Sequence, residues 1–268
     1  MSTLLLVHAH PDDESILTGG VMARAHLDGH RVVLVTATRG EEGQTTGVDG
    51  ASTSAGVGEV RSLELQRACE ILGVNRQEFL GYTGSGHGVD SNGHDPTTFV
   101  GAPLNEVADR LAALLREERP DVVVTYTSDG TYAHPDHVRA HHATIAALDT
   151  LAGEGWQPSK VYLHAVPRSF VTSTIAAARD ASISLPEEFA GLEGIPDEQI
   201  TTQVDVHGVL DRKLAACVAH SSQMHPGLPL ATMAAQLFES AFGVERFVLV
   251  RGRLSGDPPE SSLFAGVA

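Results

Sequence analysis

The first chemically dense stretch of this chain follows an apolar run near the N-terminus. Residues 4–7, LLLV, lead directly into HAHPDDES, which places His10, Asp12 and Asp13 close together. His10 and Asp13 are three residues apart where a helix is expected to begin, a spacing that lets both side chains face one point. Asp12 should then point elsewhere. The turn therefore offers an imidazole and a carboxylate to a cation, and it leaves a second carboxylate that could accept a proton.

A second cluster of the same character occurs more than a hundred residues later, in AHPDH at 133–137. His134 and His137 are again three residues apart at the start of an expected helix. Two imidazoles and one carboxylate are a common ligand set for catalytic zinc, with positions left open for water and substrate. Either cluster alone could be structural, because Asp often caps helices. Two such clusters together favour a metal site in which Asp12 could take a proton from a bound water.

The elements that must position these clusters alternate between strands and helices. Apolar, β-branched runs predict strands, and amphipathic stretches predict helices. The expected strands are 3–8, 31–38, 78–83, 121–127 and 160–166, and the expected helices are 14–28, 58–74, 104–119 and 137–152. This alternation predicts an α/β, Rossmann-like, mainly parallel sheet flanked by helices. Polar clusters follow each of the first four strands, so they should meet at the sheet edge where open α/β sheets bind ligands.

The chain changes its pattern beyond residues 1–167. Residues 203–224 read as a short strand and then a helix, and residues 233–252 read as a helix and then a strand. We therefore expect 1–167 to form the Rossmann-like catalytic domain and 168–268 to form a smaller C-terminal α+β subdomain that completes the substrate pocket. The tail from about Ser255 is expected to be frayed.

Composition narrows the classes of partner. The formal charge of -16 argues against nucleic acid or an anionic membrane as the main partner. Cys69 and Cys217 lie in apolar helical contexts, which predicts core thiols and no disulfide framework. The N-terminus has no pattern of a secretion signal, and the chain has no run of about 18 apolar residues, so the cytoplasm is the expected location. The sequence leaves a homo-oligomer open.

A nucleotide-binding Rossmann domain would carry a different first turn. Its first strand should lead into G-x-G-x-x-G, where the backbone approaches a diphosphate at a helix N-terminus. This chain has Asp12 and Asp13 at that position. Two carboxylates would repel a diphosphate and would attract a cation.

The motifs AHPDDE and HPDH, with GEEG and ERPDVVVTY between them, resemble the LmbE-like de-N-acetylase family. That family includes the N-acetylglucosaminyl-phosphatidylinositol deacetylases and the actinobacterial deacetylase and amidase of mycothiol metabolism. The motifs are nearest to the mycothiol-pathway deacetylase. The resemblance covers about residues 3–166 and continues weakly through 213–223. It implies removal of the acetyl group from an N-acetylglucosaminyl small molecule, such as N-acetylglucosaminyl-inositol.

The same resemblance implies a role for each residue of the two turns. The metal ligands would be His10, Asp13 and His137, and the metal would be Zn²⁺ or another divalent ion such as Fe²⁺. Asp12 would be the general base. His134 would help to stabilise the oxyanion.

Three further positions match substrate-contacting residues of the mycothiol-pathway deacetylase. Tyr132 would contact the acyl carbonyl, and Arg61 and Asp90 would bind sugar hydroxyls. Outside these, Glu14 is interpreted as orienting a ligand or favouring the helix N-terminus, and His220 as a packing or supporting residue.

Other functions stay open from sequence alone. Within the family, the alternatives are a mycothiol S-conjugate amidase and an antibiotic-pathway sugar de-N-acetylase. From a different class, the alternative is a non-catalytic module that binds a sugar or a nucleotide. The presence of Asp12 together with a full ligand set argues against that last class.

Overall fold

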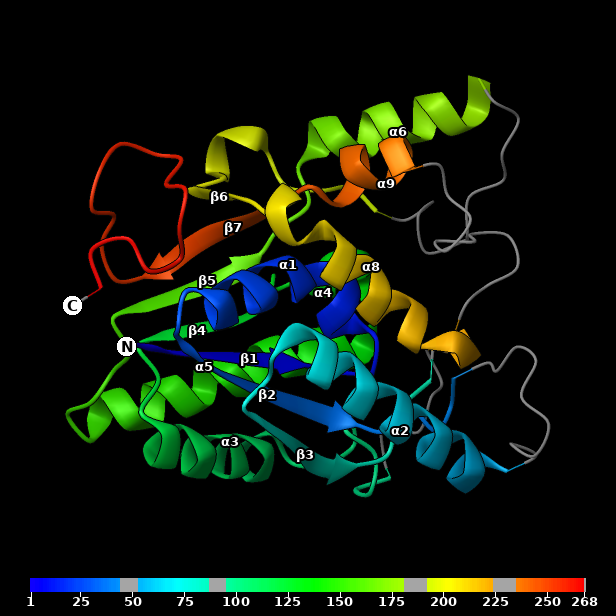
Figure 1. Ribbon diagram of the computed structural model, residues 1–268. Coiled ribbons are helices and arrows are strands. Elements are labelled where there is room, and N and C mark those ends of the chain that lie inside the picture. The colour runs from blue at the N-terminus through cyan, green and yellow to red at the C-terminus, as the bar shows by residue number, and fades with distance from the viewer. Residues whose placement is uncertain (44–52, 87–94, 181–191, 224–234, 268) are drawn as a thin grey trace.

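A single mixed sheet forms the centre of the molecule. The computed structural model describes residues 1–43, 53–86, 95–180, 192–223 and 235–267. Seven strands pair in the order β3-β2-β1-β4-β5-β7-β6 (Figure 1). Their bounds are β1 Thr3–His8, β2 Arg31–Thr38, β3 Arg76–Tyr82, β4 Val122–Tyr126, β5 Lys160–His164, β6 Thr202–Asp205 and β7 Val244–Arg251. β1 to β5 are parallel, and β7 and β6 are added antiparallel at one edge. The predicted mainly parallel α/β sheet is confirmed.

Helices cover both faces of this sheet. α1 (Asp13–Leu27), α2 (Ser54–Leu72) and α8 (Leu210–Ala219) lie on one face, and α3 (Leu104–Glu118) and α5 (Pro135–Gly153) lie on the other (Figure 1). The central strand β1 contributes Leu4 and Leu6 to the core beneath α1, α2 and α8. It contributes Leu5 and Val7 to the core beneath α3 and α5, and all four side chains are buried. Because both faces are covered, the strand reads as a continuous apolar run.

The helix starts differ from expectation for identifiable reasons. α2 begins at Ser54 because the Thr53 side chain accepts a hydrogen bond from the Gly56 N–H. α5 begins at Pro135, since His134 caps it and proline suits the first helical position. The other helices within the described residues are α4 (Gly130–Ala133), α6 (Arg168–Asp180), α9 (Ala235–Phe242), η1 (Asp197–Gln199), η2 (His207–Val209) and η3 (Ser221–Gln223). α6 was not among the helices expected from the sequence, and it buries few side chains.

Cys69 and Cys217 are both free and buried, which confirms the expected core thiols. Burial raises the pKa of Cys217 to about 12, so the thiol stays protonated. Among the helices described, none has the length and apolar character needed to cross a membrane.

A buried ion pair ties the C-terminal elements to α1. Lys213 Nζ on α8 lies 2.6 Å from Glu245 Oε1 on β7. The same carboxylate accepts the backbone N–H groups of Gly20 (2.7 Å) and Val21 (2.9 Å). A Cβ atom at Gly20 would lie 2.6 Å from the Val206 side chain, so this close approach requires glycine. The elements beyond residue 200 are therefore fixed against the helix that follows the first polar turn.

The expectation of a frayed tail from about Ser255 is wrong. Glu260 forms a buried ion pair with Lys160 at 2.6 Å, and its other oxygen accepts the Ser255 N–H at 2.6 Å. Leu263 is also buried. The sequence does not reveal these contacts, because each partner lies far away along the chain or in a stretch without periodicity.

Replacing Glu260 by Gln should lower the free energy of unfolding by about 3 kcal/mol at neutral pH, because Lys160 would lose its buried counter-charge. Burial acts to raise the pKa of Glu260, but the Lys160 ammonium and the Ser255 hydrogen bonds outweigh it and lower the pKa from 4.5 to about 2. The stabilisation is thus complete above about pH 4.5 and is lost as the pH falls toward about 2.

Urea unfolding of both proteins across this pH range measures the difference. Glu117→Gln is the control, since Glu117 pairs with Arg76 at the surface and should contribute about 0.5 kcal/mol or less. A deficit in Glu260→Gln that stays constant down to acidic pH would contradict the assignment.

Candidate active site and metal centre

The turn between β1 and α1 holds Asp12 in an unusual conformation. Asp12 has φ 115°, which non-glycine residues rarely adopt. Its backbone N–H donates to Glu14 Oε2 at 2.9 Å, and the Arg61 guanidinium donates to the Pro11 carbonyl at 2.5 Å. These contacts stabilise a backbone reversal between two consecutive carboxylates. As a result, Asp12 and Asp13 point in different directions, as their spacing predicted.

The turn between β4 and α5 is also strained and presents two histidines. Thr131 and Ala133 have φ 72° and 62° within α4. His134 then caps α5, with its Nδ1 accepting the Asp136 N–H at 3.1 Å. His137 Nδ1 lies 3.2 Å from the Gly130 carbonyl, to which it donates. This hydrogen bond leaves His137 Nε2 as the unprotonated nitrogen, which is the form that binds metals.

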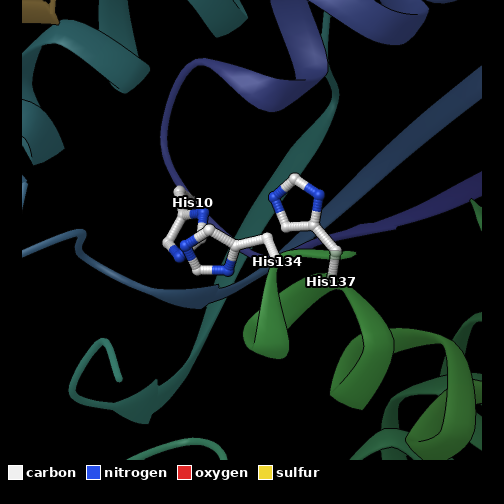
Figure 2. A group of neighbouring side chains, drawn as sticks. All are labelled: His10, His134 and His137. Carbon is white, nitrogen blue, oxygen red and sulfur yellow. The ribbon is translucent and has the colours of Figure 1, made fainter. Parts of the chain in front are cut away.

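Three imidazoles from the two turns meet at the carboxyl ends of β1 and β4. Figure 2 shows His10 beside His134, with His137 facing them. Each ring contributes a nitrogen, and these nitrogens all lie within 4.8 Å of one another. The ring centroid of His10 lies 4.7 Å from that of His134 and 5.4 Å from that of His137. The group could therefore hold a metal ion.

Asp13 lies against the same group. Its Oδ2 atom is 3.4 Å from His10 Nδ1 and 3.3 Å from His137 Nε2. Within the described part of the chain, the buried His137 Nε2 has no hydrogen-bond partner. An unpaired imidazole nitrogen facing a carboxylate and two more imidazoles suits a divalent cation. The choice of His10, Asp13 and His137 as the ligands, with His134 outside that set, stays a prediction.

The two consecutive carboxylates have opposite electrostatic surroundings. Burial raises the pKa of Asp12 and the neighbouring Asp13 adds to this, while Arg61 opposes it. For Asp13, burial acts in the same direction, but the imidazoles of His137 and His10 outweigh it and hold the pKa well below the usual value. Asp13 is therefore suited to stay charged as a ligand, and Asp12 is suited to accept a proton.

The predicted substrate-contacting residues fall into three situations. Tyr132 is half-buried, with its ring centroid 4.9 Å from that of His137 and 6.0 Å from that of His134. Arg61 is buried, and its Nη2 atom lies 3.2 Å from Asp12 Oδ2. Asp90 lies outside the described residues. The assignment of all three to substrate binding stays a prediction.

A buried hydrogen-bonded chain behind Asp13 escaped the sequence analysis. The Tyr126 hydroxyl donates to Asp13 Oδ2 at 2.7 Å and accepts the Ala9 N–H at 2.8 Å. The His8 ring lies 3.2 Å from the same hydroxyl and 2.8 Å from Thr18 Oγ1. Burial, followed by the charge of Asp13, raises the pKa of Tyr126 well above its usual value, so its hydroxyl stays a donor. The available signal was a tyrosine at the carboxyl end of a buried strand.

Asp136, inside the second motif, was also not assigned. Its Oδ2 atom lies 3.0 Å from His10 Nε2 and accepts the Ser85 N–H at 3.0 Å. Burial opposes a charge on His10, but hydrogen bonds to Asp13 and Asp136 raise the pKa of this imidazole to about 10. The carboxylates thus make the site strongly favourable for positive charge.

Comparisons with known proteins agree on a family. A family model described as PIG-L: GlcNAc-PI de-N-acetylase matches residues 5–148. The chain is also similar to the 1D-myo-inositol 2-acetamido-2-deoxy-alpha-D-glucopyranoside deacetylase of Acidothermus cellulolyticus. The two are 42% identical over 99% of this chain and 95% of the relative.

Solved structures share the fold at lower identity. The GalB 4-carboxy-2-hydroxymuconate hydratase of Pseudomonas putida has a TM-score of 0.65 at 24% identity, covering 96% of this chain and 99% of its own. The N,N'-diacetylchitobiose deacetylase of Pyrococcus horikoshii has a TM-score of 0.61 at 21% identity, covering 93% and 84%. The fold alone therefore accommodates more than one reaction, and the chemistry must be argued from the site.

Replacing Tyr126 by Phe should weaken metal binding by about 10- to 100-fold, because Asp13 Oδ2 would lose the hydroxyl that orients it. Chelator competition on the metal-loaded protein measures this affinity. Tyr82→Phe is the matched control, since its buried ring carries a hydroxyl bonded to Glu106, remote from the two turns. Equal metal affinity in Tyr126→Phe and the control would show that the hydroxyl does not support the centre.

Replacing Arg61 by Lys should lower kcat by about 10-fold or more, because one ammonium cannot reach the Pro11 carbonyl and the Asp12 carboxylate as the planar guanidinium does. Steady-state kinetics separates kcat from KM. Arg67→Lys on the exposed side of the same helix is the control. A rise in KM with kcat unchanged would mean that Arg61 acts only by binding sugar.

Proposed function

Because this chain belongs to the PIG-L family of GlcNAc-PI de-N-acetylases, we propose that it removes the acetyl group from an N-acetylglucosaminyl small-molecule glycoside. N-acetylglucosaminyl-inositol is the leading substrate, since a relative 42% identical along nearly its whole length is named for the deacetylation of that compound. The observation that carries the proposal is the meeting of three imidazoles with the Asp12 and Asp13 turn at one sheet edge.

The metal would be held by His10, Asp13 and His137. Two imidazoles and a carboxylate suit Zn²⁺, and Fe²⁺ is the alternative divalent ion. The orientation of His137 by the Gly130 carbonyl and of Asp13 by the Tyr126 hydroxyl supports this assignment. When bound, such an ion supplies Lewis acidity toward the amide carbonyl and toward water.

The residues of the two turns would move the protons. Asp12 accepts the proton of the attacking water, and its raised pKa suits this role. His134 Nδ1 accepts the Asp136 N–H, so the neutral ring carries its proton on Nε2 and can donate to the developing oxyanion. Tyr132 lies near enough to His137 to add a contact on the acyl side. As the C–N bond breaks, Asp12 returns the proton taken from the water to the amine, while His134 keeps its Nε2 proton, and acetate is the second product.

The remaining parts of the chain receive supporting roles. We propose that residues 168–268 complete the substrate pocket beside the 1–167 domain, as α8 packs against α1 and α2. Arg61 and Asp90 remain proposed sugar contacts. The proposed partner is a small acetylated sugar, and we expect the protein to bind neither nucleic acid nor a membrane. A cytoplasmic location and a possible homo-oligomer stay predictions.

The experiment is to incubate metal-loaded protein with N-acetylglucosaminyl-inositol and to measure free amine and acetate. We expect equal amounts of both products. Asp12→Asn should lower kcat by about 100- to 10,000-fold with unchanged metal content, because the amide cannot accept the proton. Asp109→Asn, at an exposed position on α3, is the matched control.

Several outcomes would contradict the proposal. Full turnover by Asp12→Asn would remove its role as base, and protein that never holds a stoichiometric divalent metal would remove the metal centre. Preference for a mycothiol S-conjugate, or for an acetylated antibiotic sugar, would replace the proposed substrate with one of those classes. Binding of the sugar without any release of acetate would indicate a non-catalytic module.

A further inference from the structure

The turn that follows α8 is bound by two buried carboxylates from the opposite end of the sequence. His220 Nε2 lies 2.8 Å from Glu14 Oε1 of α1. Glu64 of α2 accepts hydrogen bonds from the Ser222 N–H (2.8 Å) and the Ser222 hydroxyl (2.7 Å). The side chains of Glu14, Glu64 and His220 are each at most 3% exposed. This short turn is therefore fixed to α1, which begins at the Asp12 turn, and to α2, which carries Glu64 and Arg61.

Glu14 connects this turn directly to Asp12. One of its oxygens faces His220 and also accepts the Ser15 hydroxyl at 2.5 Å. The other oxygen, Oε2, accepts the backbone N–H of Asp12 at 2.9 Å. That hydrogen bond falls on the residue with φ 115°. A left-handed backbone at Asp12 persists only where surrounding contacts determine it, and this carboxylate provides one of them.

Glu64 lies on the helix that also carries Arg61, a second residue bound to the Asp12 turn. It lies one helical turn after Arg61 on α2. Arg61 in turn donates to the Pro11 carbonyl and lies 3.2 Å from Asp12 Oδ2. The turn after α8 is thus linked to the backbone of Asp12 through Glu14, and it also binds the helix that carries Arg61.

We propose that His220 is a positioning residue for deacetylation, which holds Glu14 so that Glu14 holds Asp12 in the direction needed to accept a proton. This inference rests on the proposed function of Asp12 as base. A buried ionisable pair contributes little to stability compared with apolar side chains of the same size, because desolvation offsets the attraction. A role in orienting Asp12 explains the pair better, because the second oxygen of Glu14 accepts the backbone N–H of that strained residue.

Two substitutions of His220 separate positioning from packing. Gln can place an amide nitrogen near the site of Nε2, whereas the shorter Asn reaches only as far as Nδ1. We expect His220→Gln to retain kcat within about 3-fold and His220→Asn to lower it by about 10- to 100-fold, with KM and metal content unchanged. His207→Gln is the matched control, since His207 also pairs with a carboxylate, Asp205, but lies exposed at the surface.

A second variant and a coupling test guard against simple misfolding. Glu14→Gln offers one acceptor oxygen in place of two and should lower kcat to a similar extent. The double variant Glu14→Gln/His220→Asn should be no slower than the slower single variant, because both changes interrupt one path. Additive losses, or wild-type kcat in His220→Asn, would overturn the proposal.

A readout without substrate keeps this inference separate from the proposed function. In metal-loaded protein, hydrogen exchange of the Asp12 amide should be faster in His220→Asn and Glu14→Gln than in the wild type, and unchanged in His207→Gln. Wild-type exchange in the first two variants would overturn the positioning role. If the wild-type protein deacetylates no acetylated sugar while exchange responds as expected, the proposed function fails and the His220–Glu14–Asp12 connection stands.

Discussion

The parallel pairing of β1 with β4 is the constraint on which the candidate site depends. Leu4, Leu5 and Leu6 align with Val122, Val123 and Val124, while β2 and β3 continue the sheet on the other side of β1. The strand order therefore reverses at β1, which is the place where open α/β sheets bind ligands beyond the carboxyl ends of their strands. Two turns separated by more than a hundred residues meet there. Burial on both faces fixes this register, because a shift by one residue would exchange the two cores.

The pairing alone would give a dense group of charges without distinct roles. The backbone reversal at Asp12 separates two consecutive carboxylates, and their neighbours then give them opposite tendencies. One lies among imidazoles and stays ionised, whereas the other lies beside a guanidinium with burial favouring its protonated form. Two chemical functions thus arise from the dipeptide Asp12-Asp13 through local geometry. The cost of the strained backbone is offset by hydrogen bonds that reach it from α1 and α2.

The sequence was sufficient for features that depend on local pattern. Apolar runs located β1 to β5, and the motifs AHPDDE and HPDH located the two turns and the family, which the comparisons confirm. It was insufficient where a contact joins distant residues that lack periodicity. Tyr126 behind Asp13, Asp136 beside His10 and the Glu260 tail each depend on a partner chosen by tertiary structure. α6 was also missed, and it buries only the side chains of Val171 and Ala178.

The buried contact between Glu245 and the backbone of α1 also sets an order of events during synthesis. Gly20 leaves the ribosome before Glu245, which follows 225 residues later. β7, which carries Glu245, also supplies the sheet edge on which β6 pairs. A nascent chain that ends before this strand contains every residue of the two polar turns but lacks the carboxylate that fixes their supporting helix. Completion of the site around the Asp12 turn therefore waits for a strand more than 200 residues farther along the chain, which makes its maturation a long-range folding event.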